Sequence, residues 1–157
     1  MSARVQLIPS NDIEQITHRL READEDVSRI RELVSDRAHH AYLAVLGDVT
    51  IGAVLMRWET DASEILYIAI DAAQRGQGYG KAVMAAVIGE ARQRGIRSVV
   101  VGTSNASLSQ IAFYQKCGFR LDSVRRDYFD YLSSPAYENG IQIRDMLVLR
   151  YAVRIDD

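Results

Sequence analysis

Residues 68–81 (IAIDAAQRGQGYGK) limit the fold of this chain more than any other segment. Its apolar beginning predicts the end of a buried strand, and the residues after Lys81 have helical periodicity. Between them, Gly76, Gly78 and Gly80 lack the Cβ atoms that would keep a ligand away from the backbone. The first N–H groups of a helix have no intrahelical partners and lie at the positive end of its dipole, so this turn is typical of a phosphate or diphosphate site.

Length and composition favour a single domain. The chain has 157 residues, of which 48% are hydrophobic and 25% are charged, and these values are typical of one globular unit with a substantial core. We therefore expect one domain over residues 1–157. The net charge of −2 lacks the basic excess that binding to a phosphate backbone requires, so we expect no nucleic-acid partner.

The cysteine content and the apolar runs bear on the compartment. Cys117 is the single cysteine and cannot form an internal disulfide, and the N-terminus lacks the charged-then-apolar order of a secretory signal. The longest apolar run, residues 41–56, is interrupted by Gly47 and Asp48, so it falls short of the roughly 18 residues that a membrane span needs. We expect a cytoplasmic protein with no membrane partner.

The order of the predicted elements indicates a mixed sheet. Two early helices precede a hairpin that turns at Gly47-Asp48, and a strand–helix–strand unit follows, which predicts that the fourth and fifth strands are parallel. We expect an α/β (α+β) fold with a mainly antiparallel sheet of about seven strands and about four helices. The predicted strands cover residues 4–8, 41–46, 50–58, 64–70, 98–102, 119–124 and 141–153, and the predicted helices begin near residues 13, 27, 81 and 108.

Two common nucleotide-binding motifs do not fit the glycine turn. A P-loop needs a glycine five residues before the Gly80-Lys81 pair and a Ser or Thr after it, but Arg75 and Ala82 stand there. A dinucleotide fingerprint needs the spacing G-x-G-x-x-G, whereas the glycines here alternate. The turn therefore belongs to another class of site.

A second segment, residues 105–119 (NASLSQIAFYQKCGF), completes the pattern. It follows the motif Arg75-x-x-Gly78-x-Gly80 by about 25 residues, with a helix and a strand predicted between them. With these two motifs in this order, the chain resembles the GNAT superfamily of acyl-CoA-dependent N-acetyltransferases. The resemblance is specific over about residues 64–119. Elsewhere it lies only in the order of the elements.

The resemblance implies how a cosubstrate binds. In this superfamily the parallel fourth and fifth strands splay apart, and the pantetheine arm pairs with the free edge of the fourth strand. It implies acetyl-CoA as cosubstrate and an amine as acceptor, with the diphosphate on the glycine turn and Asn105 on the pantetheine amide. The residues expected to bind acetyl-CoA are Ile68, Ala69, Ile70, Arg75, Gly76, Gln77, Gly78, Tyr79, Gly80, Lys81 and Asn105.

Transfer of an acyl group to an amine requires a base, a stabilised oxyanion and a proton for the leaving thiolate. An alkylamine with a pKa of about 10.4 is mostly protonated at pH 7, so a base or a relay is expected. The resemblance implies Tyr114 as general acid, and Glu64 at the start of the fourth strand is the first candidate base, with Tyr67 or Asp130 as alternatives. A backbone N–H near Ile70 is expected to bind the oxyanion. A core role for Tyr114 and a solvated role for Glu64 stay open.

Other reactive side chains favour no further chemistry. His39 and His40 point to opposite faces of a strand, and no cluster of Cys or carboxylate ligands accompanies them, so we expect no metal. Cys117 beside Gly118 is typical of a small buried residue rather than a nucleophile. We therefore expect direct transfer without an acyl-enzyme.

The acceptor is only weakly indicated. The loop over residues 127–138 contains three acids and no base, which favours a cationic amine. Arg125 and Arg126 could bind a substrate carboxylate or flank a solvated strand, and we prefer the second interpretation. Four aromatic residues could wall the acceptor pocket or anchor a dimer, namely Trp58, Tyr128, Phe129 and Tyr131.

The sequence thus predicts a cytoplasmic N-acetyltransferase that moves acetyl from acetyl-CoA to a primary amine of a small molecule, peptide or protein. A non-catalytic acyl-CoA sensor and a structural interaction domain are the alternatives. A homodimer formed through the last strands also stays open.

Overall fold

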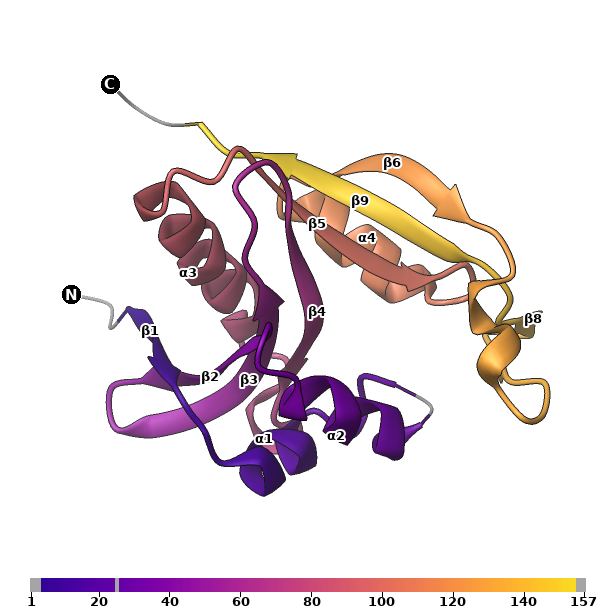
Figure 1. The fold of residues 1–157 in the computed structure, drawn as a ribbon, viewed down its shortest axis with the longest axis horizontal. Helices are drawn as coiled ribbons and strands as arrows, with labels where there is room; N and C mark the ends of the chain where they lie inside the picture. Colours follow the sequence, from indigo (N-terminus) through magenta and orange to yellow (C-terminus); the bar gives the residue numbers. More distant parts are fainter. Residues whose placement is uncertain (1–3, 25, 155–157) are drawn as a thin grey trace.

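The computed structural model describes residues 4–24 and 26–154 of the chain. Within them the chain forms four α-helices, two short 3-10 helices and nine strands (Figure 1). In order these are β1 (Val5–Pro9), α1 (Ile13–Arg19), α2 (Val27–Ser35), β2 (His40–Leu46), β3 (Val49–Arg57), β4 (Ser63–Ile70), η1 (Ala72–Gln74), α3 (Tyr79–Gln93), β5 (Ser98–Ser104), α4 (Leu108–Lys116), β6 (Arg120–Arg125), η2 (Tyr128–Tyr131), β7 (Tyr137–Glu138), β8 (Ile141–Gln142) and β9 (Met146–Ala152).

Seven strands form one mixed sheet in the order β1-β2-β3-β4-β5-β9-β6. Every neighbouring pair is antiparallel except β4 and β5, which are parallel and are joined by α3 as a crossover helix. Strands β7 and β8 form a separate small hairpin. This architecture confirms the predicted fold class and its parallel pair.

The sheet is split between β4 and β5. Only Ser63–Ile65 of β4 pairs with β5, opposite Val99–Val101, and from there the two strands diverge (Figure 1). Each strand keeps its outer neighbour, since Ile70 still lies opposite Gly52 of β3 and Ser104 lies opposite Met146 of β9. The C-terminal halves of β4 and β5 therefore present two facing strand edges.

A β-bulge in β4 lies where the split begins. Tyr67 is opposite Leu55 and Ile65 is opposite Met56, so Leu66 is an extra residue in the ladder. Without the bulge, Ile65 and Tyr67 would face the same side of the sheet. Instead Ile65 packs in the core under α3, and Tyr67 packs on the opposite face with α1 and α2.

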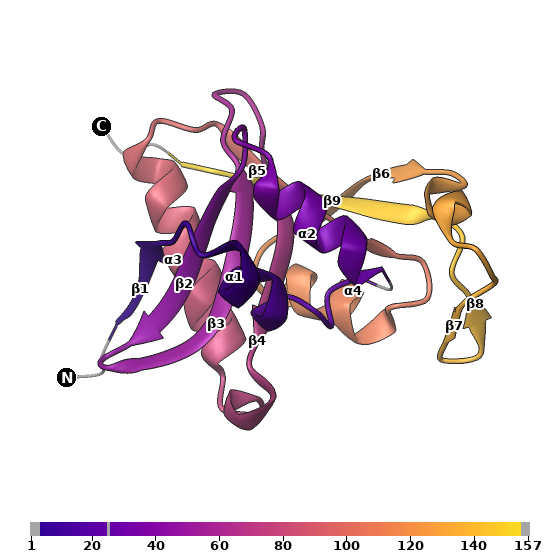
Figure 2. The same cartoon turned by 60° about the horizontal axis from the view of Figure 1, so that its bottom comes forward.

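Helices cover both faces of the sheet (Figure 2). On one face, α3 contributes an apolar stripe with helical spacing, and α4 adds Tyr114. On the other face, Ile16 and Leu20 from α1 and its C-cap pack with Ile30 of α2 against β3 and β4. Each such fully buried aliphatic side chain contributes about 1.5–3 kcal/mol of burial free energy. The α3 stripe consists of Val83, Met84, Val87, Ile88 and Ala91.

Local sequence fixes the starts of the helices. Asp12 accepts a 3.0 Å hydrogen bond from the N–H of Gln15 and caps α1. Gly78 precedes α3 with a φ of 79°, a left-handed conformation that glycine adopts at little cost. Gly78 therefore caps α3 without a side chain, and no side chain at residue 78 covers the first N–H groups of α3.

The predicted strand over residues 141–153 is wrong as a single element. Residues 141–142 belong to the β7–β8 hairpin, and the sheet strand begins at Met146. The cause is Asn105, whose side-chain oxygen accepts hydrogen bonds from the N–H groups of Arg144 and Asp145 at 2.9 and 3.0 Å. In the described part of the chain, no helix is both long enough and apolar enough to cross a membrane.

Candidate functional site

A cavity of about 870 Å³ runs along the split in the sheet. The glycine turn and the beginning of α3 close one end, and Tyr67, Tyr128 and Tyr131 lie among its other lining residues. The facing edges of β4 and β5 form its middle, together with Tyr114 of α4. The cavity thus joins the two segments that the sequence singles out, the glycine turn and the 105–119 segment.

The β4 edge offers free backbone groups to the cavity. The N–H of Asp71 donates to Ile51 O at 2.8 Å, so Asp71 and every second residue before it bond to β3. Ile68 and Ile70 lie at the alternate positions, and their N–H and C=O groups consequently point away from β3 toward the split. Of these groups, the Ile70 C=O already accepts a 3.0 Å hydrogen bond from Arg75 Nε. An extended ligand with amide groups can pair with this edge as an added strand.

The glycine turn presents a run of free donors. Among the described residues, no carbonyl of the loop accepts from the N–H groups of residues 76–81, and the first helical bond runs from Ala82 N–H to Gly78 O at 3.4 Å. Gly76 and Gly78 have φ values of 77° and 79°, which turn these donors toward one side. The positive end of α3 lies at the same place, so the turn fits a diphosphate.

Most residues predicted to bind the cosubstrate line this cavity. Gln77 and Asn105 do not. Arg75 lies at the turn, but its guanidinium pairs with Glu22 and its Nε donates to Ile70 O at 3.0 Å. The pairing with Arg75 lowers the pKa of Glu22. The predicted residues that line the cavity are Ile68, Ala69, Ile70, Arg75, Gly76, Gly78, Tyr79, Gly80 and Lys81.

Asn105 is placed differently from the expectation. Its Nδ2 donates to Gln142 O at 3.0 Å, and its Oδ1 accepts the two N–H groups of Arg144 and Asp145. These bonds direct the amide toward the 142–145 segment, and Asn105 is not among the residues that line the cavity. In this structure Asn105 fixes a loop instead of facing the pantetheine path.

Tyr114 lies in the wall of the cavity. The ring is buried, and it packs against Phe119 with the ring centroids 5.9 Å apart. Burial, with a smaller effect from the nearby Cys117, raises the pKa of the Tyr114 phenol above its ordinary value. The phenol therefore keeps its proton at neutral pH and can donate it. No hydrogen bond joins its hydroxyl to another residue within 4–24 and 26–154.

Glu64 also lines the cavity, at the start of β4. Its carboxylate accepts a 2.6 Å hydrogen bond from Nη2 of Arg57, and only 13% of the side chain is exposed. The solvated alternative for Glu64 is therefore wrong. The carboxylate is half of an ion pair that spans β3 and β4.

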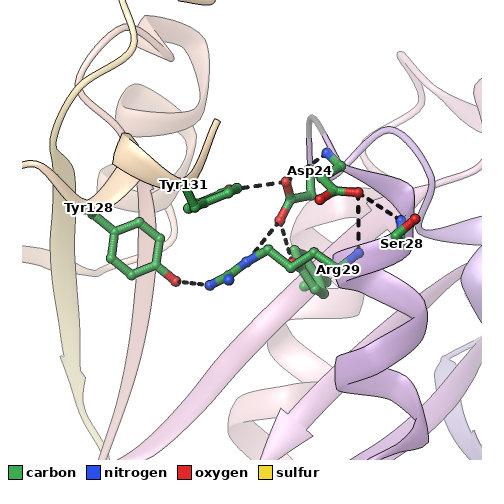
Figure 3. Close-up of polar contacts among 7 residues, drawn as sticks. Asp24, Ser28, Arg29, Tyr128 and Tyr131 are labelled. Atoms are coloured by element: carbon green, nitrogen blue, oxygen red, sulfur yellow. Dashed lines mark hydrogen bonds and ion pairs between the residues drawn. The ribbon is translucent and has the colours of Figure 1, made fainter. Parts of the chain in front are cut away.

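Asp24, which is absent from the residues predicted from the sequence, is the acidic residue with the most hydrogen-bond donors at this cavity. The side chain lies between α1 and α2 and is 7% exposed. Its carboxylate accepts a hydrogen bond from the Tyr67 hydroxyl. It accepts another from the Tyr131 hydroxyl at 3.1 Å (Figure 3). Burial, together with Asp24, raises the pKa of both phenols. The only hint in the sequence is the acidic run between the two helices, which a solvated loop would also explain.

Arg29 of α2 holds this cluster together. Its Nη2 donates to the Tyr128 hydroxyl at 2.8 Å, and its Nε lies 3.6 Å from the Asp24 carboxylate (Figure 3). The guanidinium carbon also lies 4.4 Å from the centroid of the Tyr131 ring, which is a cation–π contact. Arg29 does not line the cavity itself.

Several other candidates lie elsewhere. Trp58 donates from its indole nitrogen to the Tyr42 hydroxyl at 2.8 Å and stacks under Arg94, and it does not line the cavity. Asp130 is exposed and does not line the cavity.

Cys117 is half-buried outside the cavity, and burial raises the pKa of its thiol. Arg125 and Arg126 are exposed and do not line the cavity either.

Comparison with known proteins agrees with this geometry. The model of the acetyltransferase (GNAT) family matches residues 10–119. A protein named uncharacterized N-acetyltransferase YvbK, from Bacillus subtilis (strain 168), is 36% identical over 110 residues, which are 69% of this chain and 71% of the relative.

Two solved structures share the whole fold. A GNAT family acetyltransferase from Elizabethkingia anophelis with acetyl-CoA bound has a TM-score of 0.82 and 28% identity, covering 95% of this chain and 98% of that one. A Bacillus subtilis acetyltransferase in complex with CoA has a TM-score of 0.83 and 28% identity, covering 97% and 99%. On the match to the family model and the YvbK relative, this chain belongs to the GNAT family of acetyltransferases.

Proposed function

We propose that this chain is an acetyl-CoA-dependent N-acetyltransferase that transfers the acetyl group directly to a primary amine. The observation that carries the proposal is that one cavity is lined both by the β4 edge beside the split and by the glycine turn, where the N–H groups of residues 76–81 have no backbone acceptor among the described residues. Pantetheine contains amides that pair with a strand edge, and a diphosphate accepts from clustered N–H groups. The two features therefore match two parts of one molecule.

Three residues of the chain have separate roles in the proposed reaction. Bound acetyl-CoA supplies an activated acetyl thioester. The Ile70 N–H donates to the carbonyl oxygen of the acetyl group, Glu64 takes a proton from the amine directly or through a water, and Tyr114 gives its proton to the sulfur. The raised pKa of Tyr114 supports its role as the acid.

Residues 1–157 act in this proposal as one domain, in the cytoplasm. A homodimer through the edge strand β6 is part of the proposal, because Leu121 and Val124 of that strand are 60% and 52% exposed. Light scattering of the purified protein tests the dimer.

A CoA-release assay tests the proposed activity. Purified protein is incubated with acetyl-CoA and a panel of primary amines, and mass spectrometry identifies the acetylated product. Amine-dependent release of CoA with a matching product is expected. Binding of acetyl-CoA without any turnover would instead favour the acyl-CoA sensor.

A further inference from the structure

We propose that the end of the cavity around Asp24 is a binding site for an organic cation, and that the acceptor is an amine that carries a second positive charge. This inference rests on the proposed function, because it describes the acceptor of that reaction. The nearby aromatic side chains are those of Tyr67, Tyr128, Phe129 and Tyr131.

The charges that line the cavity are distributed unevenly. The described lining residues include two cations, Arg75 and Lys81, and both belong to the glycine turn and the first turn of α3, where the diphosphate is proposed to bind. Among the lining carboxylates, Glu22 pairs with Arg75, Glu64 pairs with Arg57, and Asp24 lies 3.6 Å from Arg29 Nε. Glu138 has no cationic partner among the described ion pairs, and Arg29 and Arg57 do not line the cavity. With the diphosphate bound, the surface that faces the rest of the cavity therefore carries carboxylates and no described cation, which favours a positively charged acceptor.

Hydrogen bonds fix the orientation of the Asp24 carboxylate at the cavity. A carboxylate has about four acceptor positions, and three of those on Asp24 are filled by the Tyr67 hydroxyl, the Tyr131 hydroxyl and the Asp26 N–H. Arg29 Nε lies 3.6 Å from Oδ2, beyond hydrogen-bond distance. Oδ2 thus accepts one described hydrogen bond, from Tyr67, and its ion pair with Arg29 is too long to be a second one, so an ammonium can bind Oδ2 beside Arg29.

Aromatic faces complete the site. Tyr128, Phe129 and Tyr131 pack edge-to-face or tilted, with centroids 5.1 to 6.2 Å apart, and all three line the cavity. A carboxylate beside aromatic rings is a common arrangement for recognising alkylammonium groups. Arg29 already makes this contact with Tyr131 from outside the cavity, so the ring accepts a cation at its face.

Calorimetry with three amines of equal length tests the site in protein saturated with CoA. The probes are 1,5-diaminopentane, pentylamine and 5-aminopentanoate. They share a five-carbon chain with an amine at one end, and the other end is an ammonium, a methyl group or a carboxylate. We expect the diamine to bind at least about tenfold more tightly than pentylamine, and the amino acid to bind most weakly. Equal affinities, or no binding of the diamine, would overturn the inference.

Two variants locate the effect. Asp24→Asn should weaken binding of the diamine about 10- to 100-fold and leave pentylamine nearly unchanged. Asp26→Asn is the matched control, because it removes the same charge from the same loop, does not line the cavity and keeps a good helix cap. If both variants weaken the diamine equally, Asp24 is not its ligand.

Thermal unfolding shows whether Asp24→Asn folds. If it does not fold, a third variant tests the site instead. Tyr131→Leu removes the aromatic face and one hydroxyl donor, and it should also reduce the preference for the diamine. An unchanged preference in Tyr131→Leu would refute the aromatic part of the site. Failure of the proposed function would appear separately, as a loss of acetyl-CoA binding or turnover in the unmodified protein.

Discussion

Arg29 on α2 lies over the ring of Tyr131 on η2, with 4.4 Å between the guanidinium carbon and the ring centroid. The same guanidinium donates to the Tyr128 hydroxyl at 2.8 Å (Figure 3). These contacts attach the loop after β6 to the helix that covers the other half of the sheet. One side chain therefore connects the two halves of the split across its mouth.

Replacing Arg29 by Met should loosen that connection. Loss of the cation–π contact, the hydrogen bond and the charge beside Asp24 should lower the free energy of unfolding by about 1–3 kcal/mol. Urea denaturation measures this change, and hydrogen exchange of the 128–132 amides should become faster. Arg31→Met is the control, because Arg31 on the same helix makes only an exposed pair with Glu14 and should change stability by less than about 1 kcal/mol. Equal losses in both variants would contradict the role assigned to Arg29.

Tyr114→Phe separates catalysis from binding. Removal of the general acid should reduce kcat by about 100-fold or more and leave the Kd of acetyl-CoA unchanged. Steady-state kinetics and calorimetry measure the two quantities. A variant with full turnover would show that the phenol supplies no proton.

The raised pKa of Tyr114 also has a consequence for the pH profile. An acid acts in its protonated form, so the rate falls only as the pH passes above its pKa. Because burial raises that pKa above the ordinary tyrosine value of about 10, kcat should show no tyrosine-dependent fall between about pH 8 and 9.5. A falling limb in that interval that disappears in Tyr114→Phe would contradict the assignment.

Glu64→Gln tests the base. The amide keeps nearly the same shape but cannot take a proton, so kcat should fall by about 100-fold. Glu59→Gln is a matched control, since Glu59 also lies near Arg57, at 3.4 Å, and its side chain is 61% exposed. Both variants weaken an ion pair of Arg57, but only the first is expected to remove the base. Equal kinetics in the two variants would assign Glu64 a structural role.

Asn105→Ala tests the corrected position of that side chain. Its amide satisfies the carbonyl of Gln142 and two N–H groups, so the variant should lose about 1–3 kcal/mol of stability, as measured by urea denaturation. The Kd of acetyl-CoA should change by less than about threefold, because Asn105 does not line the cavity. A variant that unfolds normally but binds acetyl-CoA poorly would restore the earlier expectation.

The fold follows from sequence features that act locally. Asp12 caps a helix, Gly78 takes a positive φ before α3, and apolar runs such as those of β3 and β5 form buried strands, so these elements are predictable without tertiary contacts. The predicted strand over residues 141–153 is wrong as one element because a distant side chain, Asn105, accepts hydrogen bonds from the N–H groups of Arg144 and Asp145. No pattern within that segment indicates the break.

The candidate site is predictable on one side only. The glycine turn can be predicted because its glycines follow a fixed spacing in the sequence. Its hydrogen-bond donors are main-chain N–H groups, which are present whatever side chains surround the turn. The other end depends on Asp24, Tyr67 and Tyr131, which come from three distant segments and meet only in the fold. Trp58 shows the same limit, since an aromatic residue at a strand end can line a pocket or pack, and here its ring packs against Arg94 outside the cavity.

The central claim is that the backbone of residues 76–81 binds the diphosphate of acetyl-CoA, and calorimetry of two glycine variants tests it most directly. Gly78→Glu and Gly47→Glu each place a carboxylate at a position with positive φ and open space, 79° and 61°, so they impose similar backbone strain, but only Gly78 lines the cavity. We expect one acetyl-CoA site in the unmodified protein and in Gly47→Glu, and no measurable heat in Gly78→Glu. Unchanged acetyl-CoA affinity in Gly78→Glu, or no binding by the unmodified protein, would contradict the account.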